Sequence, residues 1–153
     1  MSLVWVDRML VDVRGEGDAI VFIHGLGGSV NAWTPLLPAL PNHRCIRIDL
    51  PGAGRSHKAY ALGESTPHGG KLSVAVHADA VRRVCESQGI TRAHVVGHSF
   101  GTTIAQNIAA ETPSLVRSLA LFGALAAPPQ TLRNVMTGRA PVAREQGMFA
   151  IAE

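Results

Sequence analysis

The residues with the clearest chemical potential are a serine between two glycines, Gly97-x-Ser99-x-Gly101. A short apolar run from His94 to Val96 precedes this pattern, and small residues with helical spacing follow it. A serine at the tip of a sharp strand-to-helix turn exposes its hydroxyl, and the turn needs nearly side-chain-free positions two residues before and after it. The spacing therefore predicts that Ser99 is a nucleophile at such a turn.

The same turn predicts a site that stabilises negative charge. The first amides of a helix lack intrahelical acceptors and carry a partial positive charge. Phe100 directly follows the serine, so its N–H is the natural donor to an oxyanion formed there. His98 and the two glycines are expected to support the turn.

Two further segments place glycine-rich loops after apolar runs. Residues 20–29 lead from an apolar run into His24-Gly25-Leu26, and residues 49–56 read Asp-x-x-Gly-x-Gly-x-Ser. Together with the turn at Ser99, and in this order along the chain, they resemble the oxyanion loop, the following loop and the nucleophile elbow of the α/β-hydrolase family. The resemblance covers nearly the whole chain, whereas the chain covers only part of the family's domain.

The resemblance implies the N-terminal portion of an α/β-hydrolase fold, an α/β architecture with a mostly parallel sheet and flanking helices. It implies that Ser99 attacks a carboxylic ester or lactone to form an acyl-enzyme, with the Leu26 and Phe100 N–H groups as the oxyanion hole. His24 and Gly25 would shape the loop, because the family's catalytic histidine lies near the end of its chain. Asp49 is expected to hold its loop together by hydrogen bonds, and a role as the triad acid is the lesser alternative.

The partners that a catalytic serine needs are missing from this chain. In this fold an acid and then a histidine follow the serine, yet residues 100–153 contain no Asp and no His. Two explanations stay open: the chain is an inactive N-terminal fragment of a longer hydrolase, or it is a pseudo-hydrolase that binds a small ligand or a partner. Within the enzyme class, cofactor-free haloperoxidase, dehalogenase and carbon–carbon hydrolase activities also stay open. The dehalogenase is disfavoured, because the family's version of that chemistry has Asp where this chain has Ser99.

The end of the sequence favours the fragment. Residues 139–148 resemble the start of the cap in 3-oxoadipate enol-lactonase-like hydrolases, and the chain stops within an amphipathic pattern. We therefore expect residues 1–123 to be the N-terminal part of the core and residues 124–153 to begin a helical cap that is incomplete.

Composition excludes several other classes. The chain has 153 residues, 46% of them hydrophobic and 16% charged, which is typical of one globular domain. Its net charge of +3 comes from 14 scattered Lys and Arg residues, so no nucleic-acid partner is expected. No apolar stretch approaches the ~20 residues of a membrane span.

Cys45 and Cys85 lack metal-ligand spacing and are expected to be free thiols, which favours a cytoplasmic protein without a metal or cofactor. Oligomeric state stays open.

The helices and strands that must position the serine are predicted from the spacing of apolar residues and from the Gly and Pro residues that end such elements. We expect one or two antiparallel edge strands within 3–13, and buried strands at 19–23, 44–50 and 117–123, the last with an exposed apolar edge. Helices are expected at 31–40, at 73–87 with Ser73 as the cap, and at 102–111. Trp33 and Leu36 are expected in the core, or alternatively at the mouth of a pocket. Two amphipathic helices are expected after Pro129.

Overall fold

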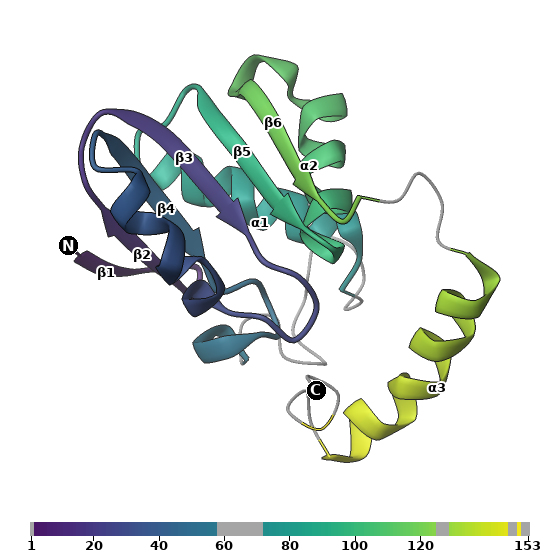
Figure 1. Ribbon diagram of the computed structural model, residues 1–153. Coiled ribbons are helices and arrows are strands. Elements are labelled where there is room, and N and C mark those ends of the chain that lie inside the picture. The colour runs from purple at the N-terminus through teal and green to yellow at the C-terminus, as the bar shows by residue number, and fades with distance from the viewer. Residues whose placement is uncertain (1, 58–71, 125–128, 147–149, 151–153) are drawn as a thin grey trace.

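A six-stranded sheet forms the centre of the computed structural model, which describes residues 2–57, 72–124, 129–146 and 150 (Figure 1). The strand order is β1-β2-β4-β3-β5-β6. The four strands β3 to β6 are parallel, and the hairpin β1-β2 is antiparallel. This arrangement confirms the predicted mostly parallel sheet. The strands are β1 (Ser2–Val6), β2 (Met9–Arg14), β3 (Asp18–Ile23), β4 (His43–Ile48), β5 (Ala93–His98) and β6 (Val116–Phe122).

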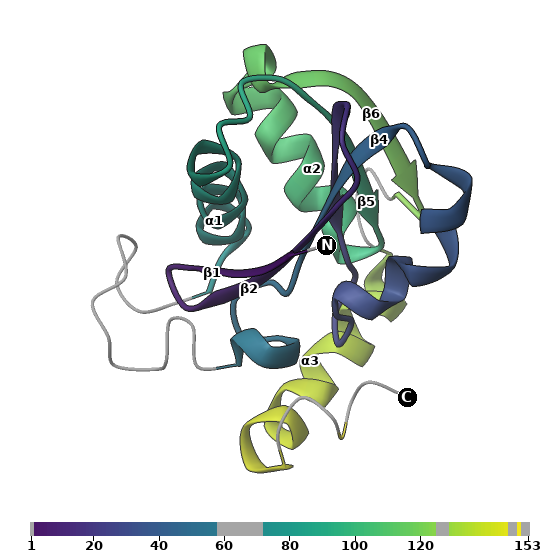
Figure 2. The same cartoon turned by 90° about the vertical axis from the view of Figure 1, so that its left-hand side faces the viewer.

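Helices cover both faces of the sheet. The helices α1 (Val74–Ser87) and α2 (Phe100–Glu111) lie on one face, and the 3₁₀ helix η1 (Val30–Ala39) lies on the other (Figure 2). Branched apolar side chains of the central strands pack against α1 and α2 in the larger core. Phe22 and Trp33 anchor the smaller core beneath η1. Two single-turn helices, η2 (Gly54–Ser56) and η3 (Pro113–Leu115), lie in connections.

The first strands and helices follow the predicted boundaries closely. The segment 3–13 forms two strands joined by a turn at Asp7 and Arg8, both with positive φ. Ser73 caps α1 by accepting a hydrogen bond from the Val76 N–H at 3.3 Å. The helix expected at 31–40 is the 3₁₀ helix η1, and Pro35 and Pro38 within it supply no backbone N–H groups.

The expectation that Leu36 lies in the core is wrong. Trp33 is buried as predicted, but Leu36 is 43% exposed. Leu37 and Leu40, which lie four and seven residues after Trp33, pack against the smaller core instead. Leu36 therefore falls on the solvent side of η1.

Beyond residue 123 the structure describes one helix, α3 (Gln130–Gln146), where we expected two. No residue of α3 is buried, and the helix stands apart from the sheet layers on the side to which β5 and β6 point (Figure 1). The rest of the expected helical region, 125–128, 147–149 and 151–153, lies outside the described residues, as does the loop 58–71. In the described part of the chain no helix has the length and hydropathy to cross a membrane.

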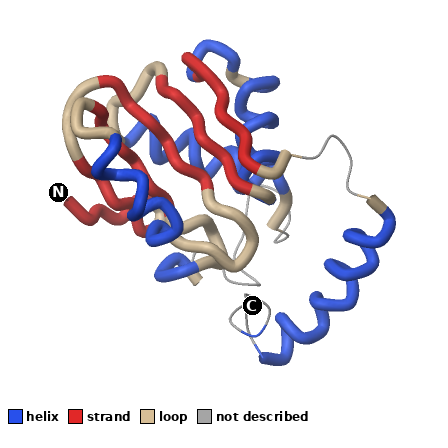
Figure 3. The backbone as a smooth tube through the Cα atoms, viewed as in Figure 1, coloured by secondary structure: helices blue, strands red, loops and turns tan. Residues whose placement is uncertain are grey.

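The parallel strands bring three loops together. Since β3, β4 and β5 run in the same direction, the loops that follow them meet at one edge of the sheet (Figure 3). These are the loops that carry His24, Asp49 and Ser99. The fold therefore places the three sequence motifs side by side.

Candidate active site

Ser99 is the single residue between the end of β5 and the start of α2. Its φ of 50° and ψ of −117° lie in a region that non-glycine residues rarely adopt, at a cost of about 1–3 kcal/mol. The Ser99 N–H donates to the Phe122 carbonyl at 2.9 Å. The Ser99 carbonyl accepts from the Thr102 N–H at 2.9 Å and from the Thr102 hydroxyl at 2.6 Å. These three bonds hold the strained residue with its side chain exposed to solvent.

The glycines beside Ser99 permit close backbone contact. A Cβ atom at Gly97 would lie 2.5 Å from the Gly101 carbonyl oxygen. A Cβ atom at Gly101 would collide with the carbonyl oxygen of Ile23 on β3. A Cβ atom at Gly25 would lie 3.2 Å from the Ser99 Cβ, so the loop after β3 also approaches the turn closely. Gly97 and Gly101 are thus needed for the approach of β3, β5 and α2, and a side chain at Gly25 would be tight.

His24 is committed to the backbone. It is buried, its Nδ1–H donates to the Gly25 carbonyl at 2.7 Å, and its Nε2 accepts from the Leu50 N–H at 3.1 Å. Burial lowers the pKa of His24 below its ordinary value and keeps the ring neutral. With both ring nitrogens occupied, His24 ties the loop after β3 to the loop after β4.

The two expected oxyanion donors lie on either side of the turn. Leu26 is 49% exposed in the loop after β3, and its N–H donates to no backbone oxygen among the described residues. Phe100 begins α2, where the first amides have no intrahelical acceptor. The Phe100 ring packs edge-on against His77 of α1, with ring centroids 5.3 Å apart.

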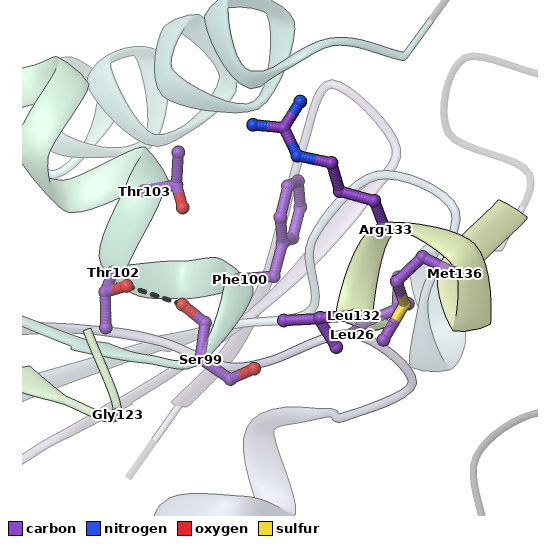
Figure 4. Close-up of a pocket in the computed structure, with 9 residues that line it drawn as sticks. All are labelled: Leu26, Ser99, Phe100, Thr102, Thr103, Gly123, Leu132, Arg133 and Met136. Carbon is purple, nitrogen blue, oxygen red and sulfur yellow. Dashed lines mark hydrogen bonds between the residues drawn. The ribbon is translucent and has the colours of Figure 1, made fainter. Parts of the chain in front are cut away.

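Ser99, Leu26 and Phe100 line one cavity of about 290 Å³ (Figure 4). Thr102, Thr103 and Gly123 border it on the sheet side. The opposite wall comes from Leu132, Arg133 and Met136 of α3. Leu132 and Met136 belong to the amphipathic pattern from which a cap over the site was expected, whereas nothing in the sequence singled out Arg133. Most of the lining is apolar, so the cavity suits an apolar group bound next to the serine hydroxyl.

A base and an acid are not found beside Ser99. No hydrogen bond joins the Ser99 hydroxyl to a histidine or carboxylate in the described segments. The exposed His98 ring meets the edge of Trp33 at a centroid distance of 6.5 Å. Asp49 accepts backbone N–H bonds from Val30 at 2.6 Å and from Arg55 at 2.8 Å. Asp49 therefore ties loops together, and among the described residues it forms no hydrogen bond with a histidine.

The described residues also contain no group of three His, Cys, Asp or Glu side chains that could hold a metal ion. Cys45 and Cys85 are buried free thiols. Burial raises the pKa of Cys85 to about 12, so this thiol is unreactive at neutral pH.

Comparison with known proteins finds one family. Residues 18–152 match the family model described as alpha/beta hydrolase fold. The "Dihydrolipoyllysine-residue acetyltransferase component of acetoin cleaving system" of Cupriavidus necator is 35% identical over 70% of this chain and 26% of its own length. The "Putative carbamate hydrolase RutD" of Variovorax paradoxus is 34% identical over 74% of this chain and 40% of its own length.

A solved structure, "Marine microorganism esterase", is 25% identical with a TM-score of 0.72, and the match covers 88% of this chain and 49% of that one. The chain thus spans between about a quarter and a half of the length of these three proteins.

Proposed function

The chain belongs to the α/β-hydrolase family, and on that premise we propose that Ser99 is the nucleophile of a hydrolase that cleaves a carboxylic ester or lactone through an acyl-enzyme. The observation that carries the proposal is the Ser99 turn itself. A hydroxyl held in strained backbone geometry faces an apolar cavity at the N-terminus of α2. A pure binding protein has no need of that strain, whereas a nucleophile gains exposure from it.

The Leu26 and Phe100 amides would stabilise the oxyanion of the tetrahedral intermediate. Both belong to residues that border the cavity beside Ser99. One such donor is worth about 3 kcal/mol of the activation barrier in serine hydrolases. The apolar walls would hold the acyl or alcohol group of a small substrate.

The relatives' names support hydrolysis of a carboxylic acid derivative. One is named for carbamate hydrolysis and one solved structure for esterase activity. These names describe the two relatives, and they favour an acyl substrate for this chain as well. The enol-lactonase-like resemblance of residues 139–148 narrows the proposal to small esters and lactones.

We further propose that the acid and the base of the triad lie outside these 153 residues. After Ser99 the sequence offers only the acids Glu111, Glu145 and Glu153 and no histidine. In this fold the partners follow the serine in the order acid, then histidine. Residues 1–123 would be core and residues 124–153 the start of the cap. The 153-residue chain alone would then lack the acceleration that the base supplies. The buried free cysteines support a reducing compartment such as the cytoplasm.

A fluorophosphonate probe tests the proposal. We would label the 153-residue chain and a chain extended to the next stop codon of its gene, each beside a Ser99→Ala variant. Ser118→Ala is a matched control, because the Ser118 hydroxyl lies 2.7 Å from the His94 Nδ1 and forms a serine–histidine pair away from the cavity. We expect the probe to label the extended chain. Ser99→Ala should abolish this labelling, and Ser118→Ala should leave it intact.

Two other results would change the assignment. If neither chain is labelled, the non-catalytic pseudo-hydrolase becomes the better account, with the cavity as its ligand site. Strong labelling of the 153-residue chain would mean that one of the histidines before Ser99 acts as the base.

A further inference from the structure

The loop between His24 and Val30 is bound at both ends to residues of β4 and of the loop that follows it. At its start, the His24 Nε2 accepts from the Leu50 N–H at 3.1 Å. At its end, the Val30 N–H donates to Asp49 Oδ1 at 2.6 Å, and the Val30 carbonyl accepts from Arg47 Nη1 at 2.9 Å. The side chains of Asp49 and Arg47 thus hold the N–H and the carbonyl of Val30.

Arg47 is itself held in a buried ion pair. Its side chain is 1% exposed, and its Nη2 lies 2.7 Å from Asp12 Oδ2, whose side chain is 5% exposed. The two residues stand directly opposite each other in the β2–β4 register. Arg47 Nη1 also donates to the Thr34 hydroxyl at 2.8 Å, which adds a second bond to η1. One guanidinium therefore connects β2, β4 and the first turns of η1.

Stability alone does not account for this ion pair. Burying two charges costs free energy that their attraction only partly returns, and well-packed apolar residues usually do as well. The Arg47 Nε is buried without a hydrogen-bond partner in the described residues, which adds to the cost. What an apolar pair could not supply is the directed bond from Arg47 to the Val30 carbonyl.

We propose that Arg47, oriented by Asp12, is a positioning residue for the oxyanion loop 24–29. Arg47 holds Val30 at one end of the short loop, and His24 holds the other end. Leu26 lies between these two points. The inference rests on the proposed function in one respect, since that function assigns the Leu26 N–H as an oxyanion donor. Arg47 would touch no substrate and would act only through the loop.

Hydrogen–deuterium exchange of the 153-residue chain tests the proposal. The double substitution Asp12→Leu/Arg47→Met removes both buried charges, and Arg14, which also pairs with Asp12, remains partly exposed to water. Arg47→Lys keeps a charge opposite Asp12 but lacks the fork that reaches Val30 as well. Arg117→Met is the matched control, because Arg117 makes an exposed ion pair with Asp18 at 2.7 Å.

The expected result is local. In both Arg47 variants, amides of residues 24–34 exchange about tenfold faster or more, the change expected from losing a charge-assisted hydrogen bond. Amides of β4 and β5 keep wild-type protection, and Arg117→Met changes neither region. Where Ser99 reacts with the fluorophosphonate probe, the double variant should react about tenfold more slowly or worse, since a displaced donor no longer stabilises the oxyanion.

Two results would overturn the proposal. The first is wild-type protection of residues 24–34 in folded variants, which would mean that the loop needs no help from Arg47. The second is an equal loss of protection in the loop, in β4 and in β5, seen both in Arg47→Lys and in the double variant. It would mean that the Asp12–Arg47 pair stabilises the whole fold and not the loop in particular. Absence of probe labelling in the wild type would count against the proposed function alone, because exchange does not depend on Ser99.

Discussion

At the scale of single residues, the two glycines around Ser99 leave no room for a side chain. Neither Gly97 nor Gly101 has positive φ, so the penalty for a side chain is steric. We expect Gly97→Ala and Gly101→Ala each to lower the free energy of unfolding by at least about 2 kcal/mol, because the backbone oxygens they would strike cannot move aside. Chemical denaturation measures this change.

Gly138→Ala is the control for these two variants. A Cβ atom at Gly138 on α3 would meet nothing within 4 Å. Alanine is also the better helix former, so the free energy of unfolding should change by less than about 0.5 kcal/mol or rise slightly. Equal effects at all three positions would refute the steric explanation.

His24 makes stability depend on pH. Burial lowers its folded-state pKa below the ordinary 6.5, so below that pH the unfolded chain binds a proton that the folded chain excludes. The free energy of unfolding should therefore fall as pH decreases. Denaturation at pH values from about 7 to about 5 should show a shallower slope for His24→Asn than for the wild type. His57→Asn, at an exposed position, should keep the wild-type slope; a slope that His24→Asn leaves unchanged would contradict this assignment.

Residue identity and short-range spacing were enough to predict the turn at Ser99, but not the residues that hold the neighbouring loop 24–29. Ser99 and its glycines lie within five positions of one another, so their backbone constraint is visible in the sequence. Asp12 and Arg47 are 35 positions apart and meet only because β2 and β4 pair in one particular register. No local pattern encodes that register. The Asp7-Arg8 turn was missed for another reason, since its positive φ values occur without a glycine.

At the scale of elements, α3 contributes walls to the cavity without contributing to the core. None of its residues is buried, yet Leu132, Arg133 and Met136 border the cavity. We expect a chain ending at residue 123 to unfold within about 1 kcal/mol of the full chain, because removing exposed residues rarely costs more. By contrast, Ile104→Ala in α2, at a fully buried position, should cost about 2–5 kcal/mol. Loss of cooperative unfolding in the shortened chain would argue against a boundary near residue 123.

Element types were predicted better than element surroundings. The apolar runs and caps predicted the bounds of β3 to β6, α1 and α2 closely. The prediction that 117–123 is a buried strand is wrong, because β6 is the last described strand of the sheet and none of its residues is buried. Leu36 was misplaced because the side of η1 that faces the sheet is set by Trp33, Leu37 and Leu40 together. The contribution of α3 to the cavity depends on where the chain turns after residue 124, which periodicity alone does not determine.

At the scale of the whole molecule, the two edges of the sheet differ in how they meet solvent. β1 is a short strand in a tight hairpin, whereas β6 is a seven-residue parallel strand with no described strand beyond it. Leu119 and Phe122 on β6 are 37% and 53% exposed. The strand carries Arg117 near its start but no lysine or proline within Val116–Phe122, the residues that usually protect such an edge.

An unprotected strand edge with exposed apolar side chains favours pairing with another chain. We therefore expect the isolated 153-residue chain to self-associate, with a sedimentation coefficient that rises with concentration. Leu119→Lys should shift the chain toward the monomer, because a charge on the edge opposes strand pairing. Trp5→Lys, on the β1 edge at 61% exposure, should leave association unchanged. A monomer at every concentration with a sharp, cooperative melt would show that β6 needs no further cover, and equal effects of the two lysines would move the contact away from β6.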